Sequence, residues 1–358
     1  PILFYKSFDL FHTLKNYGIN YERKLTEVRD GRSSLINYDK HEWAFDHFHE
    51  FRKLKTKYKD FVVWRRLPYS GKTINIDKNG FRHTKDYSEG SSKNNILFFG
   101  GSTMWGTGSN DENTIPSLYS KEYQLRTYNF GESGYTSRQS LALLINLYLE
   151  GKIKPDKNII IFYDGFNDVF MGCRSEIDKI QTQREKQINK ILEINTDNDD
   201  FWPISDLRFI FLPTITLIEK IKDRGRKNNS ESNYYNCDTD EKKAKFIANS
   251  VIKNWTIASE LAKLNGDKFI GVLQPSTFIS NPDLKKLKNT KYFKPDKNIK
   301  KQFDEVYKEI IMLLDNNKDI KFLDLTKIFD QKENIYIDEV HVSPNGNQMI
   351  VEKIGNLK

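Results

Sequence analysis

The sequence predicts an α/β protein whose core is a mostly parallel β-sheet covered by helices on both faces. From residue 94 onwards, short apolar runs alternate with helical stretches, and this alternation is typical of βαβ units. The runs are apolar over consecutive residues, as expected of parallel strands buried on both faces. Most runs also lead into Gly, Ser, Asp or Asn, at the carboxyl ends of strands where open sheets bind ligands.

Five apolar runs and four helical patterns define the predicted main domain. The runs, interpreted as strands, cover 96–99, 128–130, 159–163, 269–273 and 322–325. The helical patterns cover 137–149, 243–264, 299–314 and 344–354. Ahead of the last pattern, Ser343 and Pro344 are residues favoured at the N-cap and the first position of a helix.

Residues 1–93 lack this alternation and are predicted to form an N-terminal extension packed on the main domain, which covers 94–358. Within the extension, residues 35–58 are predicted to be helical. Residues 69–82 are interpreted as a β-hairpin that turns at Asn79-Gly80, a pair favoured in two-residue turns.

A second departure from the alternation lies at about 174–240, after the third predicted strand. This stretch is charged and rich in asparagine around a more apolar middle, and it is too long for a simple connection. We interpret it as a partly helical insertion. A lid or substrate-binding element and a plain surface excursion are both compatible with its composition.

The charge and the cysteine content exclude few functions. The net charge is +8, which would suit a polyanionic partner. The basic residues, however, form only short runs, such as residues 285–288. We therefore favour lysines spread over the surface and expect no nucleic-acid partner. Cys173 and Cys237 form no disulfide framework and have no metal-binding spacing; they either pair with each other or stay free.

Two further features bear on metals and on location. His41, His47 and His49 lie among acidic residues, so a metal site is conceivable there, although packing and surface roles are favoured. No run of eighteen apolar residues is present, and the sequence begins at Pro1 without a methionine. We therefore expect an upstream segment, such as a signal or a membrane anchor.

The carboxyl ends of the predicted strands carry a set of residues that suits acyl transfer. Ser102 supplies a nucleophile, His341 a base, and Asp338 a carboxylate that orients the base. The Ser102 and Gly134 backbone N–H groups and the Asn167 side-chain amide are candidate donors to an oxyanion. Each residue alone is more often a turn, loop or surface residue, but their succession after consecutive strands favours a catalytic role.

These residues resemble the four blocks of the SGNH (GDSL-type) hydrolase family. The matching stretches are Phe99-Gly100-Gly101-Ser102, Asn129 to Gly134, Gly165-Phe166-Asn167-Asp168 and Asp338-Glu339-Val340-His341. The resemblance implies a three-layer α/β/α, flavodoxin-like fold with a five-stranded parallel sheet. It implies Ser102 as nucleophile, Ser102, Gly134 and Asn167 around the oxyanion, Asp338 and His341 as the relay, and no metal or cofactor. One position departs from the pattern, because Gly101 stands where the family has Asp.

The expected function is that of a serine esterase that removes an acyl group, expected to be acetyl, from a carbohydrate or cell-envelope polysaccharide. An O-acyltransferase that uses the same acyl-enzyme is the alternative, and a non-catalytic glycan-binding protein is less favoured. From the family's habits, the expected location is the cell envelope, outside the cytoplasm and anchored in the membrane. A cytoplasmic location is the alternative.

Overall fold

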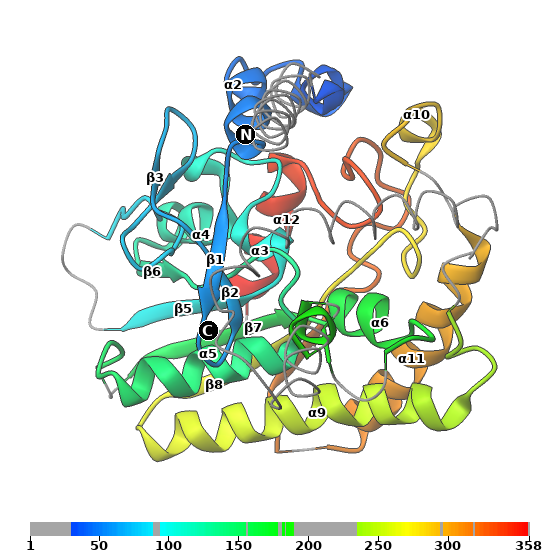
Figure 1. Cartoon of the computed structure of the whole chain (residues 1–358). Coiled ribbons are helices and arrows are strands. Elements are labelled where there is room, and N and C mark those ends of the chain that lie inside the picture. Colours follow the sequence, from blue (N-terminus) through cyan, green and yellow to red (C-terminus); the bar gives the residue numbers. More distant parts are fainter. Residues whose placement is uncertain are drawn as a thin grey trace, which may run out of the picture.

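A computed structural model describes residues 30–88, 94–154, 157–177, 181–182, 184–189, 235–293, 296–317 and 319–356 of the chain. Its centre is a five-stranded sheet with the strand order β6-β5-β7-β8-β9, in which every neighbouring pair is parallel (Figure 1). The predicted parallel sheet of an α/β fold is thereby confirmed. Numbered along the chain, its strands run 2-1-3-4-5, so the order changes direction beside β5, the first of the five.

The element bounds agree closely with the sequence in the main domain. The strands are β1 Thr56–Lys59, β2 Val63–Arg66, β3 Tyr69–Ser70, β4 Asn75–Ile76, β5 Asn95–Gly100, β6 Arg126–Asn129, β7 Ile159–Asp164, β8 Lys268–Leu273 and β9 Phe322–Asp324. The α-helices are α2 Ala44–Phe51, α3 Ser102–Trp105, α4 Ile115–Tyr123, α5 Ser137–Leu149, α6 Phe166–Gly172, α9 Glu241–Leu264, α10 Lys285–Lys288, α11 Lys297–Asp315 and α12 Pro344–Gly355. Three short 3-10 helices are η1 Gly31–Ser34, η2 Ile36–Tyr38 and η3 Asp111–Asn113.

The sheet is buried on both faces, and successive side chains of one strand enter different cores. In β5, Leu97 and Phe99 belong to one apolar cluster, whereas Ile96 and Phe98 belong to another. This alternation follows from the pleat, which points neighbouring side chains to opposite faces. It explains why the strands are apolar at consecutive positions.

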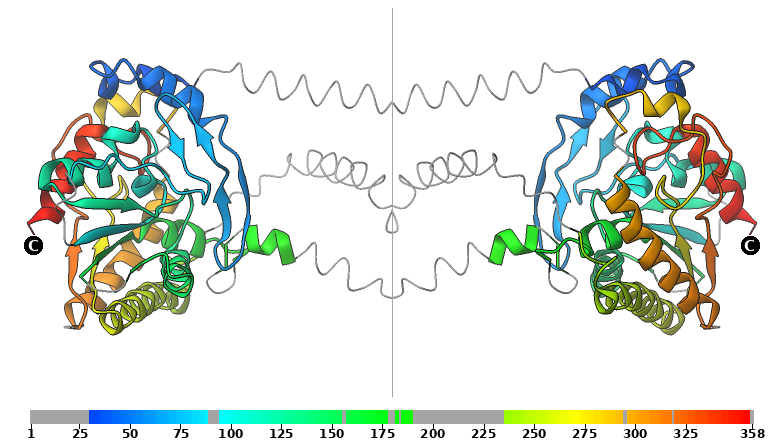
Figure 2. Two further views of the ribbon diagram at one scale, coloured as in Figure 1. Left: turned by 90° about the vertical axis from the view of Figure 1, so that its left-hand side faces the viewer. Right: turned by 90° about the vertical axis from the view of Figure 1, so that its right-hand side faces the viewer.

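Helices cover the two faces as separate layers (Figures 1 and 2). On one face α5 and α9 pack against the strands, with α11 beside α9. On the other face α4 packs on β6 and α12 packs on α4. The arrangement is the three-layer α/β/α order that the resemblance implied.

The N-terminal segment 30–88 lies along one side of the sheet domain, as Figure 2 shows. The predicted helix over 35–58 is mostly wrong: only Ala44–Phe51 is α-helical, while the 3-10 helix η2 lies before it and strand β1 begins at Thr56. The predicted hairpin over 69–82 is partly right. Its paired strands β3 and β4 turn at residues 71–74, while Asn79 and Gly80 form a further turn that brings Arg82 back to Ile76.

The two cysteines are joined in a disulfide between Cys173 and Cys237, whose Cα atoms are 5.2 Å apart. A single antiparallel bridge between Arg174 and Tyr235 lies directly inside it. The predicted insertion at about 174–240 thus leaves and re-enters the domain at one place. Most of that insertion, including its more apolar middle, lies outside the described residues.

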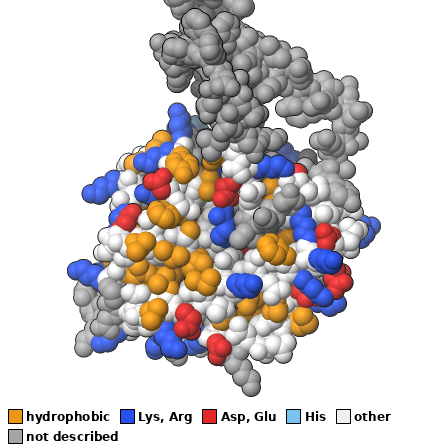
Figure 3. All heavy atoms as spheres, turned by 60° about the horizontal axis from the view of Figure 1, so that its bottom comes forward, with side chains coloured by type: hydrophobic (Ala, Val, Ile, Leu, Met, Phe, Trp, Pro, Cys, Tyr) orange, Lys and Arg blue, Asp and Glu red, His pale blue; other side chains and the backbone are white. Residues whose placement is uncertain are grey.

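The face formed by α5 and α9 carries apolar and charged side chains side by side (Figure 3). Leu149 at the end of α5 and Leu264 at the end of α9 are both exposed. On the face drawn in Figure 3, Lys and Arg alternate with Asp and Glu instead of forming one basic patch. Within the described part of the chain, no helix is both long enough and apolar enough to span a bilayer.

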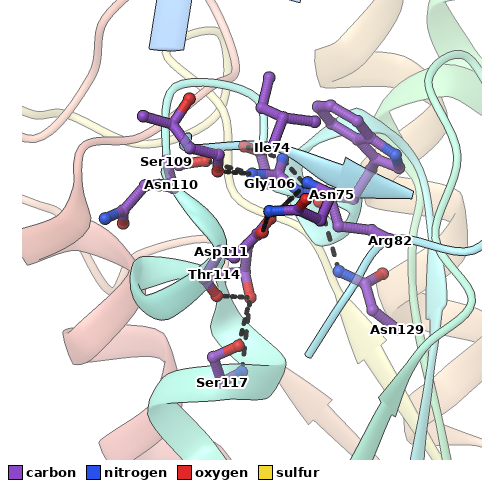
Figure 4. A network of polar contacts seen from close by, with 12 residues as sticks. Ile74, Asn75, Arg82, Gly106, Ser109, Asn110, Asp111, Thr114, Ser117 and Asn129 are labelled. Carbon is purple, nitrogen blue, oxygen red and sulfur yellow. Dashed lines mark hydrogen bonds and ion pairs between the residues drawn. The ribbon is translucent and has the colours of Figure 1, made fainter. Parts of the chain in front are cut away.

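A buried arginine ties the N-terminal segment to the loop that follows α3 (Figure 4). The Arg82 guanidinium is fully buried and pairs with Asp111, with Nε and Oδ1 2.9 Å apart. It also donates to the carbonyl oxygens of Ser109 at 2.7 Å and Gly106 at 3.1 Å. The guanidinium lies over the Trp105 ring, 4.3 Å from its centre. This one side chain therefore satisfies several buried acceptors at once.

Replacing Arg82 with methionine is expected to lower the free energy of unfolding by about 3–5 kcal/mol, because the buried Asp111 carboxylate loses its cationic partner and the Ser109 and Gly106 carbonyls each lose a donor. Urea unfolding followed by circular dichroism measures this. Arg126→Met is the matched control, since the Arg126–Asp86 pair is exposed and is expected to contribute little. An Arg82→Met chain as stable as the Arg126→Met chain would contradict the expectation.

Candidate active site

Ser102 stands at the carboxyl end of β5, on a sharp turn between the strand and helix α3. Gly100 enables this turn: its φ is +150°, and a Cβ there would lie 2.4 Å from the Tyr163 carbonyl oxygen. Gly101 is the N-cap of α3, and Gly106 ends the helix in the left-handed conformation. The glycines thus place the Ser102 side chain at the end of the sheet where the β-α loops meet.

The structure brings the predicted nucleophile, base and acid together. Nε2 of His341 lies 2.7 Å from Oγ of Ser102, and Nδ1 of His341 lies 2.7 Å from Oδ2 of Asp338. A carboxylate only accepts hydrogen bonds, so Nδ1 carries the proton and Nε2 is free to accept one from Ser102. This is the tautomer that a serine–histidine–aspartate relay requires.

A short loop after β9 holds the relay in shape. Tyr336 and Val342 form an antiparallel bridge, and the loop between them carries Asp338 and His341. Oδ1 of Asp338 accepts the backbone N–H groups of Val340 at 3.1 Å and His341 at 2.8 Å. Ser343 occupies the predicted N-cap position of α12, but its hydroxyl donates to the Asn334 carbonyl instead of capping the helix.

The electrostatics of the site favour an ionised Asp338. Burial alone would raise the pKa of this carboxyl group. The charge of His341 and its hydrogen bond, followed by the charge of Arg32, outweigh burial and lower the pKa to about 2. Asp338 is therefore a carboxylate over the whole range in which imidazole titrates.

Asn167, the predicted oxyanion donor, lies in the first turn of α6, the helix that follows β7. Its Nδ2 donates to the Tyr135 carbonyl at 2.7 Å, which leaves the second N–H of the amide for a ligand. A Cβ at Gly101 would lie 2.4 Å from this Nδ2, so the amide sits directly beside the residue preceding Ser102. The missing side chain at Gly101 is what makes room for it.

Gly134 lies in the loop after β6, and its φ of +79° is a conformation that favours glycine. The loop is joined to the end of β5 because the Glu132 N–H donates to the Gly100 carbonyl at 3.0 Å. Trp64 from the N-terminal segment supports it by donating from Nε1 to the Ser133 carbonyl at 3.0 Å. The segment that carries Gly134 is therefore held next to the nucleophile turn.

A buried charge cluster underlies this loop and was not predicted from the sequence. Glu132 is fully buried, and its Oε1 lies 3.2 Å from Nε of Arg66. Arg66 also donates from its backbone N–H to Oε2 of Glu132 and from Nη2 to Oγ of Ser133. Both residues thus link strand β2 of the N-terminal segment to the loop.

Two further carboxyl groups, those of Asp164 and Asp168, flank Asn167 in the sequence. Burial raises the pKa of Asp168 to about 6, although hydrogen bonds from Ser137 oppose the shift. Burial likewise raises the pKa of Asp164 well above its usual range. Asp168 accepts the Ser137 hydroxyl at 2.6 Å and the Ser137 N–H at 3.1 Å, and so fixes the start of α5 against the Asn167 turn.

A cleft of about 620 Å³ opens beside the relay. Among the described residues, its lining includes His341 but not Ser102, Gly134 or Asn167. Aromatic and aliphatic side chains form much of it, and charged residues stand with them; the lining is Phe166, Phe170, Phe278, Asp296, Lys297, Ile299, Asp338, Glu339, Val340 and His341. The cleft therefore extends from the histidine side of the site.

Of the three histidines considered above for a metal site, His47 has a structural role. His47 is buried, and its Nε2 accepts the Gly108 N–H at 3.1 Å. Glu50 accepts backbone N–H groups of residues 72–74, which fixes the turn between β3 and β4. The described residues hold no group of three or more His, Cys, Asp or Glu side chains arranged to bind a metal.

Comparison with known proteins gives structural likenesses only. No family model and no curated protein sequence matches the chain. A member of the lipolytic protein G-D-S-L family from Veillonella parvula is similar at 13% identity and a TM-score of 0.41, over 74% of this chain and 97% of that one. The acetyl xylan esterase AlAXEase is similar at 12% identity and a TM-score of 0.41, over 74% of this chain and 98% of that one. An acetyl xylan esterase from Geobacillus stearothermophilus is similar at 14% identity and a TM-score of 0.37, over 74% of this chain and 94% of that one. These values are low, so the roles proposed below rest on the residues of the site.

Proposed function

We propose that this protein is a serine esterase of the SGNH type. The observation that carries the proposal is the hydrogen-bonded series from Ser102 through His341 to Asp338, with both links at 2.7 Å. An ionised carboxylate, an oriented imidazole and a serine on a glycine turn are the parts needed to activate a hydroxyl. The Asn167 amide beside this serine adds a donor for the developing oxyanion.

In the proposed reaction, His341 takes the Ser102 proton as Oγ bonds to the ester carbonyl carbon. The carbonyl oxygen becomes an oxyanion that accepts hydrogen bonds from Asn167 and from the Ser102 and Gly134 backbone N–H groups. The ester C–O bond then breaks, and His341 passes its proton to the leaving alcohol. Water, deprotonated by His341, attacks the acyl-enzyme, and the acid leaves as Ser102 regains its proton.

The proposed substrate is an acetylated carbohydrate. His341 must protonate the leaving alcohol, so the cleft beside His341 is on the alcohol side of the ester. Apolar rings suit the C–H face of a sugar, and the charges of Asp296 and Lys297 suit its hydroxyl groups. The large space thus serves the alcohol, which is compatible with a small acyl group.

An O-acyltransferase is the second candidate. The acyl-enzyme is the same, and the cleft that receives one sugar alcohol can also receive another in place of water. Mass spectrometry of an acetylated oligosaccharide, incubated with and without an unacetylated acceptor, tests both candidates. Free acetate in both incubations supports the esterase, an acetylated acceptor supports the transferase, and an unchanged substrate contradicts both.

A location outside the cytoplasm is part of the proposal. The Cys173–Cys237 disulfide supports it, because disulfides form and persist mainly in oxidising compartments. Thiol labelling of the protein taken directly from its cells tests this point. Two free thiols in the native protein would favour the cytoplasmic alternative.

Replacing Phe170 with alanine is expected to raise KM for an acetylated oligosaccharide several-fold. Phe170 is partly exposed in the cleft and stacks on Phe166, with ring centres 5.6 Å apart. Losing one such aromatic contact costs about 1 kcal/mol. Hydrolysis of ethyl acetate, whose alcohol is too small to reach the ring, should stay unchanged. Phe45→Ala, at an exposed position of helix α2, is the matched control. Equal effects of Phe170→Ala on both substrates would contradict this use of the cleft.

A further inference from the structure

We propose that Arg32, from the N-terminal segment, is a positioning residue for the relay and sets the pH range in which His341 accepts a proton. The inference rests on the proposed function, since Arg32 acts through Asp338. Nη1 of Arg32 donates to Oδ2 of Asp338 at 3.2 Å. Arg32 lies far outside the four sequence blocks, at a separation of 306 positions from Asp338.

The two oxygens of Asp338 have different neighbours. Oδ1 accepts backbone N–H groups of its own loop, at 2.8 Å and 3.1 Å. Oδ2 is the oxygen that lies 2.7 Å from Nδ1 of His341, and it is also the one that Arg32 contacts. Oδ1 also lies 2.9 Å from Nδ1 of His341, so both oxygens face the imidazole. The backbone of the loop holds Oδ1, while Arg32 holds Oδ2, the nearer of the two.

Arg32 is itself firmly held. Asp30 accepts from both Nε and Nη2 of Arg32, with the Nη2–Oδ2 distance at 2.8 Å. The guanidinium lies over the Phe48 ring, 4.9 Å from its centre, and the side chain is only 15% exposed. A planar guanidinium with one edge on Asp30 and another nitrogen on Asp338 is a rigid link between the two carboxylates.

The charges along this series alternate, from Asp30 through Arg32 and Asp338 to His341. Tyr38 also interacts electrostatically with Arg32 and Asp338, but burial raises its pKa, so it stays neutral. Glu339 is the neighbouring acidic residue of the same loop. Arg32 opposes the positive charge that His341 acquires on protonation, and Asp30 partly cancels this effect. The pair thus adjusts how readily the imidazole is protonated.

The test measures how fast a fluorophosphonate probe labels Ser102 from pH 4 to 9, in Arg32→Met, Arg32→Lys and Asp30→Asn chains. In Arg32→Met we expect the labelling rate to fall about tenfold. We also expect the acidic limb of its pH profile to move to higher pH by roughly half a unit or more. Loss of the cation favours protonated His341, which is the reason for this direction. Arg32→Lys should keep the acidic limb at the wild-type pH and recover part of the labelling rate. Lysine restores the positive charge but not the two-pronged geometry of the guanidinium.

Asp30→Asn gives the opposite sign and is the second, independent variant. It leaves the Arg32 charge uncompensated, so the acidic limb should move to lower pH, while Asn still suits the N-cap position that Asp30 occupies. Arg126→Met, which removes an exposed arginine, should match the wild type throughout. The proposal would be overturned if the acidic limb of the pH profile stayed at the wild-type pH in both Arg32→Met and Asp30→Asn. A wild-type chain that is never labelled would instead contradict the proposed function, so the two failures are distinguishable.

Discussion

A chain in which Ser102 is replaced by alanine is expected to lose at least roughly 10⁴-fold in kcat on any ester that the wild type hydrolyses. The hydroxyl removed is the only group that could form the acyl bond in the proposed reaction. Its Oγ lies 2.7 Å from Nε2 of His341, and Gly100 and Gly101 set the backbone around it, so folding should be unaffected. Acetate release from p-nitrophenyl acetate and from an acetylated oligosaccharide measures the loss.

Ser250→Ala is the matched control for this experiment. Ser250 lies on helix α9, is not buried, and its hydroxyl donates to the Phe246 carbonyl of the same helix. It should retain wild-type turnover and wild-type stability. Turnover in the Ser102→Ala chain within tenfold of the wild type would rule out the acyl-enzyme on this serine, and the esterase and transferase candidates would both be lost.

Placing an aspartate at position 101, where SGNH hydrolases have one before their serine, is expected to lower the activity of this protein. In Gly101→Asp, kcat should fall by about 10²- to 10³-fold, the range found when one oxyanion donor is lost. The added Cβ would stand 2.4 Å from Nδ2 of Asn167, and so the amide must leave its place and its bond to the Tyr135 carbonyl. The smallest change, Gly101→Ala, should already show most of the effect.

The mechanism of this loss is testable by combination. If Gly101→Ala acts by displacing Asn167, then adding it to Asn167→Ala should cause little further loss, because the donor is already gone. Losses that multiply would mean that Gly101 acts in another way. A Gly101→Asp chain with wild-type kcat would show that the amide at this position is not needed.

The fold of the main domain was predictable because its strands are buried on both faces. Strand β7, Ile159–Asp164, begins at the residue where the apolar run begins, and helix α5 matches its predicted bounds of 137–149. The short helices α4 and α6 were missed. Helix α6 has only seven residues, so its periodicity covers barely two turns.

The N-terminal segment was harder to predict because its structure depends on the domain beneath it. Residues 56–66 fold as the β1–β2 pair, and the positions that decide their burial belong to other parts of the chain. Arg65 and Arg66 are buried there because Glu132 is buried opposite them. Local propensity contains no information about such a partner.

The residues of the candidate site likewise differ in whether the sequence alone could predict them. Ser102 and Asn167 stand in short blocks with glycine turns, Asp338 and His341 stand three positions apart in another block, and the structure places the four together. Arg32 carries no such signal, because an arginine after an aspartate is common on any surface. Its meaning lies in the distance to Asp338, which only the folded chain defines.

The disulfide has a consequence for how this chain can vary. Cys173 and Cys237 are 64 positions apart in sequence, yet they fix the entry and the exit of the intervening segment at one point on the domain. The domain is thereby insulated from the length of that segment, since no strand or helix of the sheet has to shift when residues are added or removed inside the covalent ring. A protease cut within the ring would leave one covalently joined molecule, which separates into two pieces only after reduction. The chain thus has a place where the domain can accommodate new sequence without a change in its sheet.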